Sequence, residues 1–241
     1  MKNSIKQQIT KACIGKFING DDKLFPFPKQ ITFEGNKILY NGQAFAEFDE
    51  SRRHLLINRR LGLDNRGRIN ALLSHTALLP SVTYKVIDEA NTHIFYTDSK
   101  GRINKTVHQL TKRYTQQRDN REQTKALMCK NEDMAPYNLY AGTGKRPPFQ
   151  IRDEGGHIIA DSIGGIPEAI NIFPQAYVVN HSSEWRGMEK SIKVALEQGE
   201  HVHIKTQFHY PLLSNRPKAY DYWVKINGIS KKFSFVNKNK V

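Results

Sequence analysis

His157 stands in an unusual local setting, behind two glycines and an acidic pair in the segment DEGGHIIADSIGG, residues 153–165. A neutral imidazole can take a proton from water near neutral pH. Asn180 and Glu189 follow it in the chain, and such side chains supply the oxygen ligands that Mg²⁺ prefers, either directly or through bound water. Residues of these types suit the hydrolysis of a phosphodiester, which needs a deprotonated water and charge compensation on the phosphate.

The net charge points to the same class of substrate. The chain of 241 residues has a formal charge of +14 and a pI near 9.7, which favours an extended acidic partner, most commonly nucleic acid. An anionic membrane surface is the weaker alternative, because no basic amphipathic helix or lipidation signal is present. We expect no signal peptide and no transmembrane segment. Cys13 and Cys129 form neither a disulfide framework nor a metal-binding spacing.

The elements that would carry these residues indicate an α+β protein. Residues 31–48 alternate in short runs and predict an antiparallel meander, whereas the leucine and isoleucine spacing of 51–63 and 68–79 predicts helices. A boundary at Pro80-Ser81 would separate an N-terminal α+β module, residues 1–80, from a second domain, residues 81–241. In that domain, residues 84–103 predict strands with a turn at Asp98–Gly101, followed by a basic helical stretch over 104–130.

The last third of the chain carries the strongest local signals. Residues 182–199 predict a helix that Ser182 or Ser183 caps and Gly199 closes, since apolar residues recur there at helical spacing. Residues 201–210 alternate as a strand, and Asn227-Gly228 predicts a tight hairpin between two further strands.

Two other motifs are weaker. The segment AGTGK, residues 141–145, resembles a phosphate loop but lacks its earlier glycine and its final serine or threonine, so a plain loop is the better interpretation. His201 and His203 have a spacing that could bind metal, yet they alternate with apolar residues along one strand. A solvated or substrate-facing strand explains them better.

Together, the glycine-histidine strand, the extended segment and the helix that opens after Asn180 resemble the DNA/RNA non-specific endonucleases, which have a ββα-metal finger. The resemblance is strongest to the branch with a D-x-G-G-H motif found in secreted bacterial toxins. It implies His157 as general base, Asn171 as support of the active-site loop and Asn180 as the ligand of one Mg²⁺ ion, which Mn²⁺ could replace. Trp185 and Glu189 match the family's N-x-x-x-W-x-x-x-E pattern with one extra residue after Asn180, and Glu189 would act through metal-bound water.

The sequence departs from the better-known D-R-G-H branch, because Gly155 takes the place of its arginine. A phosphate clamp must then come from elsewhere, and Arg216, Arg121 and Arg186 are our candidates. The resemblance further implies cleavage of DNA, with RNA left open, to leave 5′-phosphate ends, as well as export or delivery into target cells and a cognate inhibitor protein. Two other interpretations remain: a non-catalytic nucleic-acid-binding protein, and an interaction module that docks an acidic partner.

Overall fold

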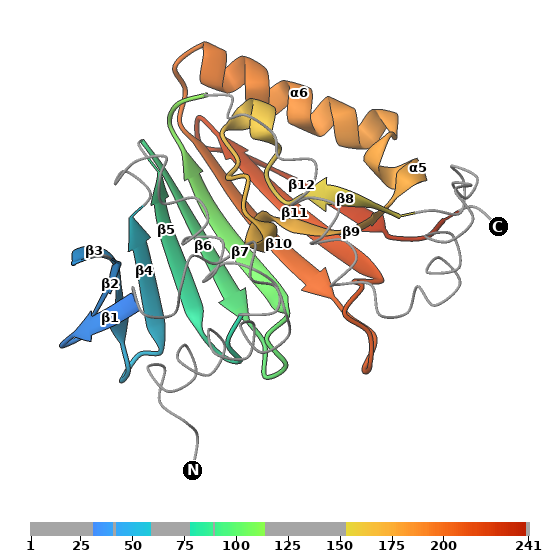
Figure 1. Ribbon diagram of the computed structural model, residues 1–241. Coiled ribbons are helices and arrows are strands. Elements are labelled where there is room, and N and C mark those ends of the chain that lie inside the picture. The colour runs from blue at the N-terminus through green and yellow to red at the C-terminus, as the bar shows by residue number, and fades with distance from the viewer. Residues whose placement is uncertain (1–30, 41, 59–77, 89, 114–152, 240–241) are drawn as a thin grey trace, which may run out of the picture.

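A computed structural model describes residues 31–40, 42–58, 78–88, 90–113 and 153–239. These residues form one large sheet, a small two-stranded sheet and a few helices (Figure 1). The α+β class expected from the sequence is therefore confirmed. No helix in the described ranges is long and apolar enough to cross a membrane.

The large sheet has ten strands in the order β1-β2-β3-β4-β5-β6-β7-β10-β11-β12. Their bounds are β1 (Ile31–Glu34), β2 (Lys37–Tyr40), β3 (Gln43–Asp49), β4 (His54–Asn58), β5 (Thr83–Asp88), β6 (Asn91–Thr97), β7 (Ile103–Leu110), β10 (Val202–His209), β11 (Ala219–Ile226) and β12 (Ile229–Val236). Neighbouring strands pair antiparallel except β4 and β5, which are parallel.

The chain between β7 and β10 supplies a layer over one face of this sheet. It contains β8 (Asp153–His157), the short 3₁₀ helices η6 (Asp161–Ile163) and η7 (Ala169–Asn171), β9 (Ile172–Ala176), α5 (Tyr177–Asn180) and α6 (Ser183–Glu197). β8 and β9 pair antiparallel, with His157 opposite Ile172. Figure 1 shows α6 lying across the β10–β12 end of the large sheet, with α5 leading into it. Two strands and a helix therefore follow one another, as predicted.

Helix α6 forms where the sequence predicts it. Ser182 Oγ accepts a hydrogen bond from the Trp185 backbone N–H at 3.2 Å and so caps the first turn. Gly199, with φ of +78°, adopts the left-handed conformation that ends the helix at little steric cost. The buried residues lie on one stripe, and they are Trp185, Met188, Ile192, Ala195 and Leu196. This stripe fixes which face of the helix packs on the sheet.

The strands at this end also match their predictions. β10 alternates buried and outward-facing residues along its length, and the Asn227-Gly228 turn has positive φ at both positions, 49° and 82°, as a two-residue hairpin turn requires. The ring of Trp185 packs edge-on against Tyr220, Tyr222 and Phe235. These contacts join α6 to the sheet through a shared aromatic core.

Two helix predictions are wrong in the ranges that the structure describes. Residues 54–58 form strand β4 instead of a helix, and the start of the predicted basic helix forms β7. In β4 only Leu55 and Ile57 are buried in the core, a two-residue period that the helical interpretation overlooked. Pairing with β3 and β5 supplies the hydrogen bonds that override local propensity. The other helix, at 68–79, falls mostly outside the described residues.

The predicted boundary at Pro80-Ser81 falls within one sheet. β4 pairs with β5 on the far side of that boundary, and Leu78 and Leu79 are buried in the same core as the residues of β5. Arg53 donates to the carbonyls of Ser81 and Pro80 at 3.1 Å each. The first strands thus extend the sheet, and independent folding of residues 81–241 stays a prediction.

Candidate active site

Strand β8, which ends in His157, is fixed at its first residue by a buried ion pair. The Arg216 guanidinium donates to both carboxylate oxygens of Asp153, at 2.5 and 2.8 Å, and to the Asn237 carbonyl at 2.7 Å. The Asp153 side chain is 3% exposed. A paired arginine and carboxylate of this kind sets orientation as well as position, so the start of β8 has a defined place beside β11 and β12.

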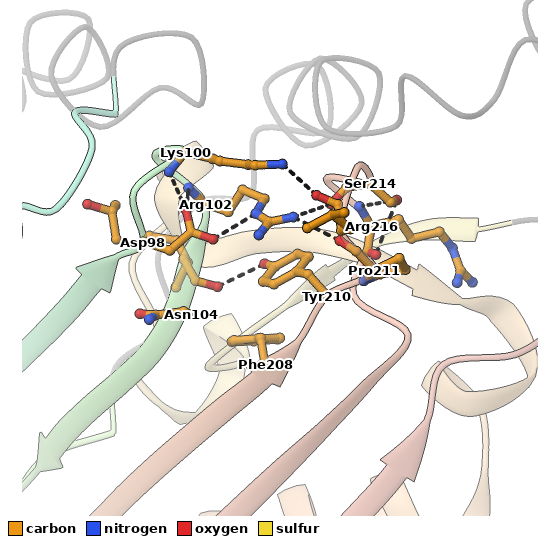
Figure 2. A network of polar contacts seen from close by, with 12 residues as sticks. Asp98, Lys100, Arg102, Asn104, Phe208, Tyr210, Pro211, Ser214 and Arg216 are labelled. Carbon is orange, nitrogen blue, oxygen red and sulfur yellow. Dashed lines mark hydrogen bonds and ion pairs between the residues drawn. The ribbon is translucent and has the colours of Figure 1, made fainter.

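The loop that carries Arg216 is itself held by the turn between β6 and β7. Asp98 accepts from the Arg102 guanidinium at 2.7 Å, and Arg102 donates to the carbonyls of Pro211 and Ser214 at 3.1 and 2.8 Å. Figure 2 shows this network, with the Tyr210 ring below Arg102, 4.6 Å from the guanidinium carbon. The turn predicted at Asp98–Gly101 therefore supports β8 from a distance.

The glycine before His157 is required by a close approach between strands. A Cβ on Gly156 would lie 2.1 Å from the Gln175 side-chain oxygen on β9 and 2.7 Å from its Cβ. Gln175 is buried and donates to the Tyr220 hydroxyl at 2.8 Å, so it has little freedom to move aside. The second glycine of the motif thus lets β8 pack tightly on β9, and His157 emerges partly exposed at the end of the strand.

Asn171 holds the loop that follows His157. Its amide donates to the carbonyls of Ile159 and Ile166 at 2.9 and 2.7 Å, and its oxygen accepts from the Ile159 N–H at 3.0 Å. The backbone carbonyl of Asn171 also accepts from Ile158 at 2.7 Å. The side chain is fully buried. These contacts are those expected of an asparagine that supports the loop beside the candidate base.

The adjacent acidic residue, Glu154, joins β8 to the start of the helical layer. Its Oε2 accepts from the Asn180 amide at 2.9 Å and meets His181 Nε2 at 2.8 Å. His181 Nδ1 in turn meets the Arg186 guanidinium at 2.7 Å. A polar chain of four side chains therefore runs from β8 across α5 to the first turn of α6, close to the surface.

This geometry fits a divalent cation at Asn180. An ionised carboxylate only accepts hydrogen bonds, so the Asn180 atom that faces Glu154 must be the NH₂ group. The oxygen Oδ1 then points elsewhere, and no described residue donates to it. Among the described residues no three His, Cys, Asp or Glu side chains form a metal cluster. A hard cation that keeps most of its waters, as Mg²⁺ does, suits a single amide oxygen.

Glu189 and Trp185 lie on the side of α6 that approaches the sheet and the loop after His157. Burial, together with the nearby Tyr220 and the negative charge of Glu189, raises the pKa of Tyr222 well above its usual value. The Tyr222 hydroxyl donates to the Ile158 carbonyl at 3.0 Å. The Glu189 carboxylate thus acts electrostatically on Tyr222, whose hydroxyl bonds to Ile158, the residue after His157.

The three candidate phosphate-binding arginines have different positions. Arg121 lies outside the described residues. Arg186 is exposed and contacts His181 at the open end of the polar chain, where a substrate could reach it. Arg216 is 21% exposed and bonded to Asp153. Its guanidinium would therefore have to bind a phosphate and Asp153 at the same time. All three roles stay predictions.

Sequence reasoning missed the part played by Glu154 and His181. Glu154 had a usable signal, since it belongs to the acidic pair that precedes the two glycines and His157. His181 has no such signal, since only the fold brings it to Glu154 from 27 residues away.

A histidine-bearing strand, a second strand and a helix follow one another, as the resemblance to a ββα finger predicts, and the bond from Asn180 to Glu154 ties the first strand to the start of the helical layer. Residues 80–228 match the family model of the DNA/RNA non-specific endonucleases. The chain belongs to that family. Because β5 begins at Thr83, the match starts just before the first strand beyond the predicted boundary.

Among curated proteins, the chain is 29% identical over 143 residues to the type VII secretion system protein EssD of Staphylococcus aureus, strains USA300 and NCTC 8325. The match covers 56% of this chain and 20% of EssD, so the chain spans about a fifth of the length of that relative.

Among solved structures, similar chains include NucA from Streptococcus agalactiae with no metal bound, and the Sda1 nuclease with a bound zinc ion. The NucA match has a TM-score of 0.44 at 14% identity over 71% of this chain and 88% of that one. The Sda1 match has a TM-score of 0.42 at 16% identity over 61% and 76%.

Proposed function

We propose that this protein is a metal-dependent endonuclease that hydrolyses phosphodiester bonds of DNA, with RNA as an alternative substrate, and that it has little sequence preference. One observation carries the proposal beyond the family membership: Glu154, on the strand that ends in His157, orients the Asn180 amide. The strand that carries the candidate base is thereby bonded to the candidate metal ligand on α5, within one fold family.

In the proposed reaction His157 accepts a proton from a water molecule. That water adds to phosphorus, the bond from phosphorus to the 3′ oxygen breaks, and the leaving oxygen takes a proton from solvent. The products are a 5′-phosphate and a 3′-hydroxyl. A bound divalent cation would compensate charge on the phosphate and on the leaving oxygen.

The other residues act on position and charge. Asn180 would hold the cation through Oδ1 while Glu154 fixes its amide, and Glu189 would act on the cation indirectly, through water. Asn171 keeps the loop after His157 in place. Arg186 attracts the phosphate. Slight sequence preference follows because phosphate contacts carry no base information.

The biological setting is a further part of the proposal. The chain shares its nuclease region with EssD, whose name places that relative in a type VII secretion system. We propose an antibacterial toxin delivered out of the producing cell, which an inhibitor protein protects. Charge favours an acidic inhibitor, since the chain carries +14.

Plasmid cleavage with Mg²⁺, with Mn²⁺ and with EDTA tests the activity. We expect nicked and linear DNA with either metal and intact plasmid with EDTA. Asn180→Ala should raise the Mg²⁺ concentration needed for half-maximal cleavage and lower turnover. Binding without cleavage under every metal condition would favour the non-catalytic nucleic-acid-binding protein, and neither binding nor cleavage would favour the interaction module.

A further inference from the structure

The large sheet has a second face, turned away from α6 and the candidate active site. On β10, Lys205 lies between the buried residues Ile204 and Thr206, so its side chain leaves the core side. Trp223 on β11 and Lys232 on β12 do the same. These three residues are direct neighbours in the ladder, Lys205 opposite Trp223 and Trp223 opposite Lys232.

Each lysine of this row approaches the same indole ring. Lys205 Nζ lies 5.0 Å and Lys232 Nζ 5.1 Å from the Trp223 ring centroid. Two strands away from Trp223, on β7, Lys105 lies 4.9 Å from the ring centroid of Tyr96 on β6. Each of these rings thus has one or two ammonium groups beside it, an arrangement that cation–π attraction stabilises.

Charge on this face is strongly one-sided. On strands β5–β7 and β10–β12 five lysines occupy register positions on the face turned away from α6, and they are Lys85, Lys105, Lys205, Lys225 and Lys232. The outward-facing carboxylate on the same strands is Asp221, which accepts from His209 at 3.1 Å and lies 3.4 Å from Lys232. We name the row Lys205, Trp223 and Lys232, with Lys105 and Tyr96, the lysine–aromatic face.

We propose that the lysine–aromatic face binds single-stranded nucleic acid as a second, non-catalytic contact. The lysines match the phosphates of a polyanion, and the partly exposed rings offer surfaces on which unpaired bases stack once a lysine moves to a phosphate. A protein partner fits less well, because lysine is depleted at the centre of protein–protein interfaces, and here lysines stand at the centre of the row. The choice of polymer rests on the proposed nuclease function.

Tryptophan fluorescence gives a local readout of this face. The chain has two tryptophans, and Trp185 is 1% exposed beneath α6 whereas Trp223 lies on the open face. The full chain carrying His157→Ala is titrated in EDTA with a 12-residue oligothymidylate, so that no cleavage occurs. We expect the oligothymidylate to quench the fluorescence, and Trp223→Phe to remove most of that change.

Charge variants test the lysines. Lys205→Gln/Lys232→Gln should weaken oligothymidylate binding about tenfold and reduce the salt slope of log affinity by about 1.4, which is 0.7 for each lost phosphate contact on a single strand. Lys231→Gln is the matched control for Lys232→Gln. It removes the same charge from the next residue of β12, whose side chain lies over Phe233 on the other side of the sheet, 4.8 Å from that ring. We expect Lys231→Gln to bind within twofold of the parent.

Equal losses for Lys231→Gln and Lys232→Gln would overturn the proposal, as would unchanged affinity and salt slope in the double variant. If polyglutamate quenched Trp223 fluorescence to the same extent as oligothymidylate, the proposal would also be overturned, and an acidic protein would be the better candidate partner. Because these are binding measurements without metal, a chain that binds here yet never cleaves would refute the proposed function and leave this inference standing.

Discussion

The two ends of the ten-stranded sheet are held in different ways. At the β10–β12 end, buried or partly buried side chains bond to backbone groups of the layer and of the chain beside β11 and β12: Arg216 to Asn237, Asn171 to Ile159 and Ile166, and Asn237 to Pro174 and Pro217. At the β1–β4 end, the described strands are joined by their ladders, by core residues such as Ile38 and Leu55, and by Arg53, which donates to the Ser81 and Pro80 carbonyls. Helix α6 contacts β10 and β11, and α5 contacts β8 and β9.

One part of the chain therefore positions the candidate active-site residues, and the other part extends the sheet. Apolar packing tolerates small shifts, whereas a buried hydrogen bond fixes direction and is expensive to leave unmade. The region rich in such bonds is also the region that the family match covers. We infer that side-chain-to-backbone bonds place His157 and Asn180, and that β1–β4 add area and stability without contacting substrate.

Removing an Asp–Arg ion pair from each end of the sheet tests whether the two ends are held differently, and the largest effect is expected here. Asp153→Ala leaves the partly buried Arg216 guanidinium without its carboxylate, so we expect a loss of about 3–4 kcal/mol in the free energy of unfolding. Arg52→Ala, in the turn between β3 and β4, removes a pair whose arginine is 76% exposed and should leave the urea midpoint unchanged. Equal midpoint shifts would show that the two ends are held alike.

Asn171→Ala should have the next largest effect. It strips partners from the buried N–H of Ile159 and from the carbonyls of Ile159 and Ile166, for an expected loss of about 2–3 kcal/mol. Cleavage by the folded fraction should fall as well, because the loop after His157 loses its support. Urea denaturation and cleavage rate, measured on one preparation, check both, and a variant as stable and active as the parent would remove Asn171 from the account.

Tyr222 should make the free energy of unfolding depend on pH in the alkaline range. Burial, Tyr220 and Glu189 raise the pKa of Tyr222 in the folded chain, whereas the unfolded tyrosine ionises near its ordinary value of about 10. The unfolded state therefore releases the proton first, and stability is lost as pH rises above about 10, by up to about 1.4 kcal/mol per pH unit for this group. Tyr222→Phe should cost about 1 kcal/mol at pH 7 and flatten the alkaline loss. An identical alkaline slope in the variant would contradict the assignment.

The smallest expected effect on cleavage comes from removing the first strands. A fragment that begins near Ser81 keeps every residue assigned to the chemistry, so we expect cleavage per folded molecule within a few-fold of the full chain. The fragment should be less stable, since Leu78 and Leu79 leave the core and β5 becomes an edge strand. A soluble, folded fragment that does not cleave DNA would show that the first 80 residues complete the active site.

Local signals predicted most of the β8–β12 region. Ser182 and Gly199 set the ends of α6, and Asn227-Gly228 set the last hairpin, because each acts through its own backbone. The strand β4 escaped prediction, since Leu55, Leu56 and Ile57 form a short continuous apolar run that fits a helix as well as a strand, and only the neighbouring strands decide between them.

The candidate site likewise has features that the sequence predicts and features that only the fold reveals. Asn171 could be assigned through the family resemblance, and the structure gives it the expected loop contacts. The link from Glu154 to Asn180 and His181 depends on strand register and on the direction in which α5 leaves β9, neither of which a sequence motif encodes. Arg216 stays a candidate phosphate ligand, and its bond to Asp153, 63 residues away in the chain, is one that only the fold reveals.

The central claim is that His157 acts as the base and not as a binding residue. Plasmid cleavage and DNA affinity, measured side by side for the parent chain and His157→Ala, test it directly. We expect His157→Ala to reduce cleavage by about 10²–10⁴-fold and to change DNA affinity by less than about threefold, because the substitution leaves the charge that attracts DNA untouched. Cleavage within a few-fold of the parent, with the variant folded, would contradict it and place the base elsewhere.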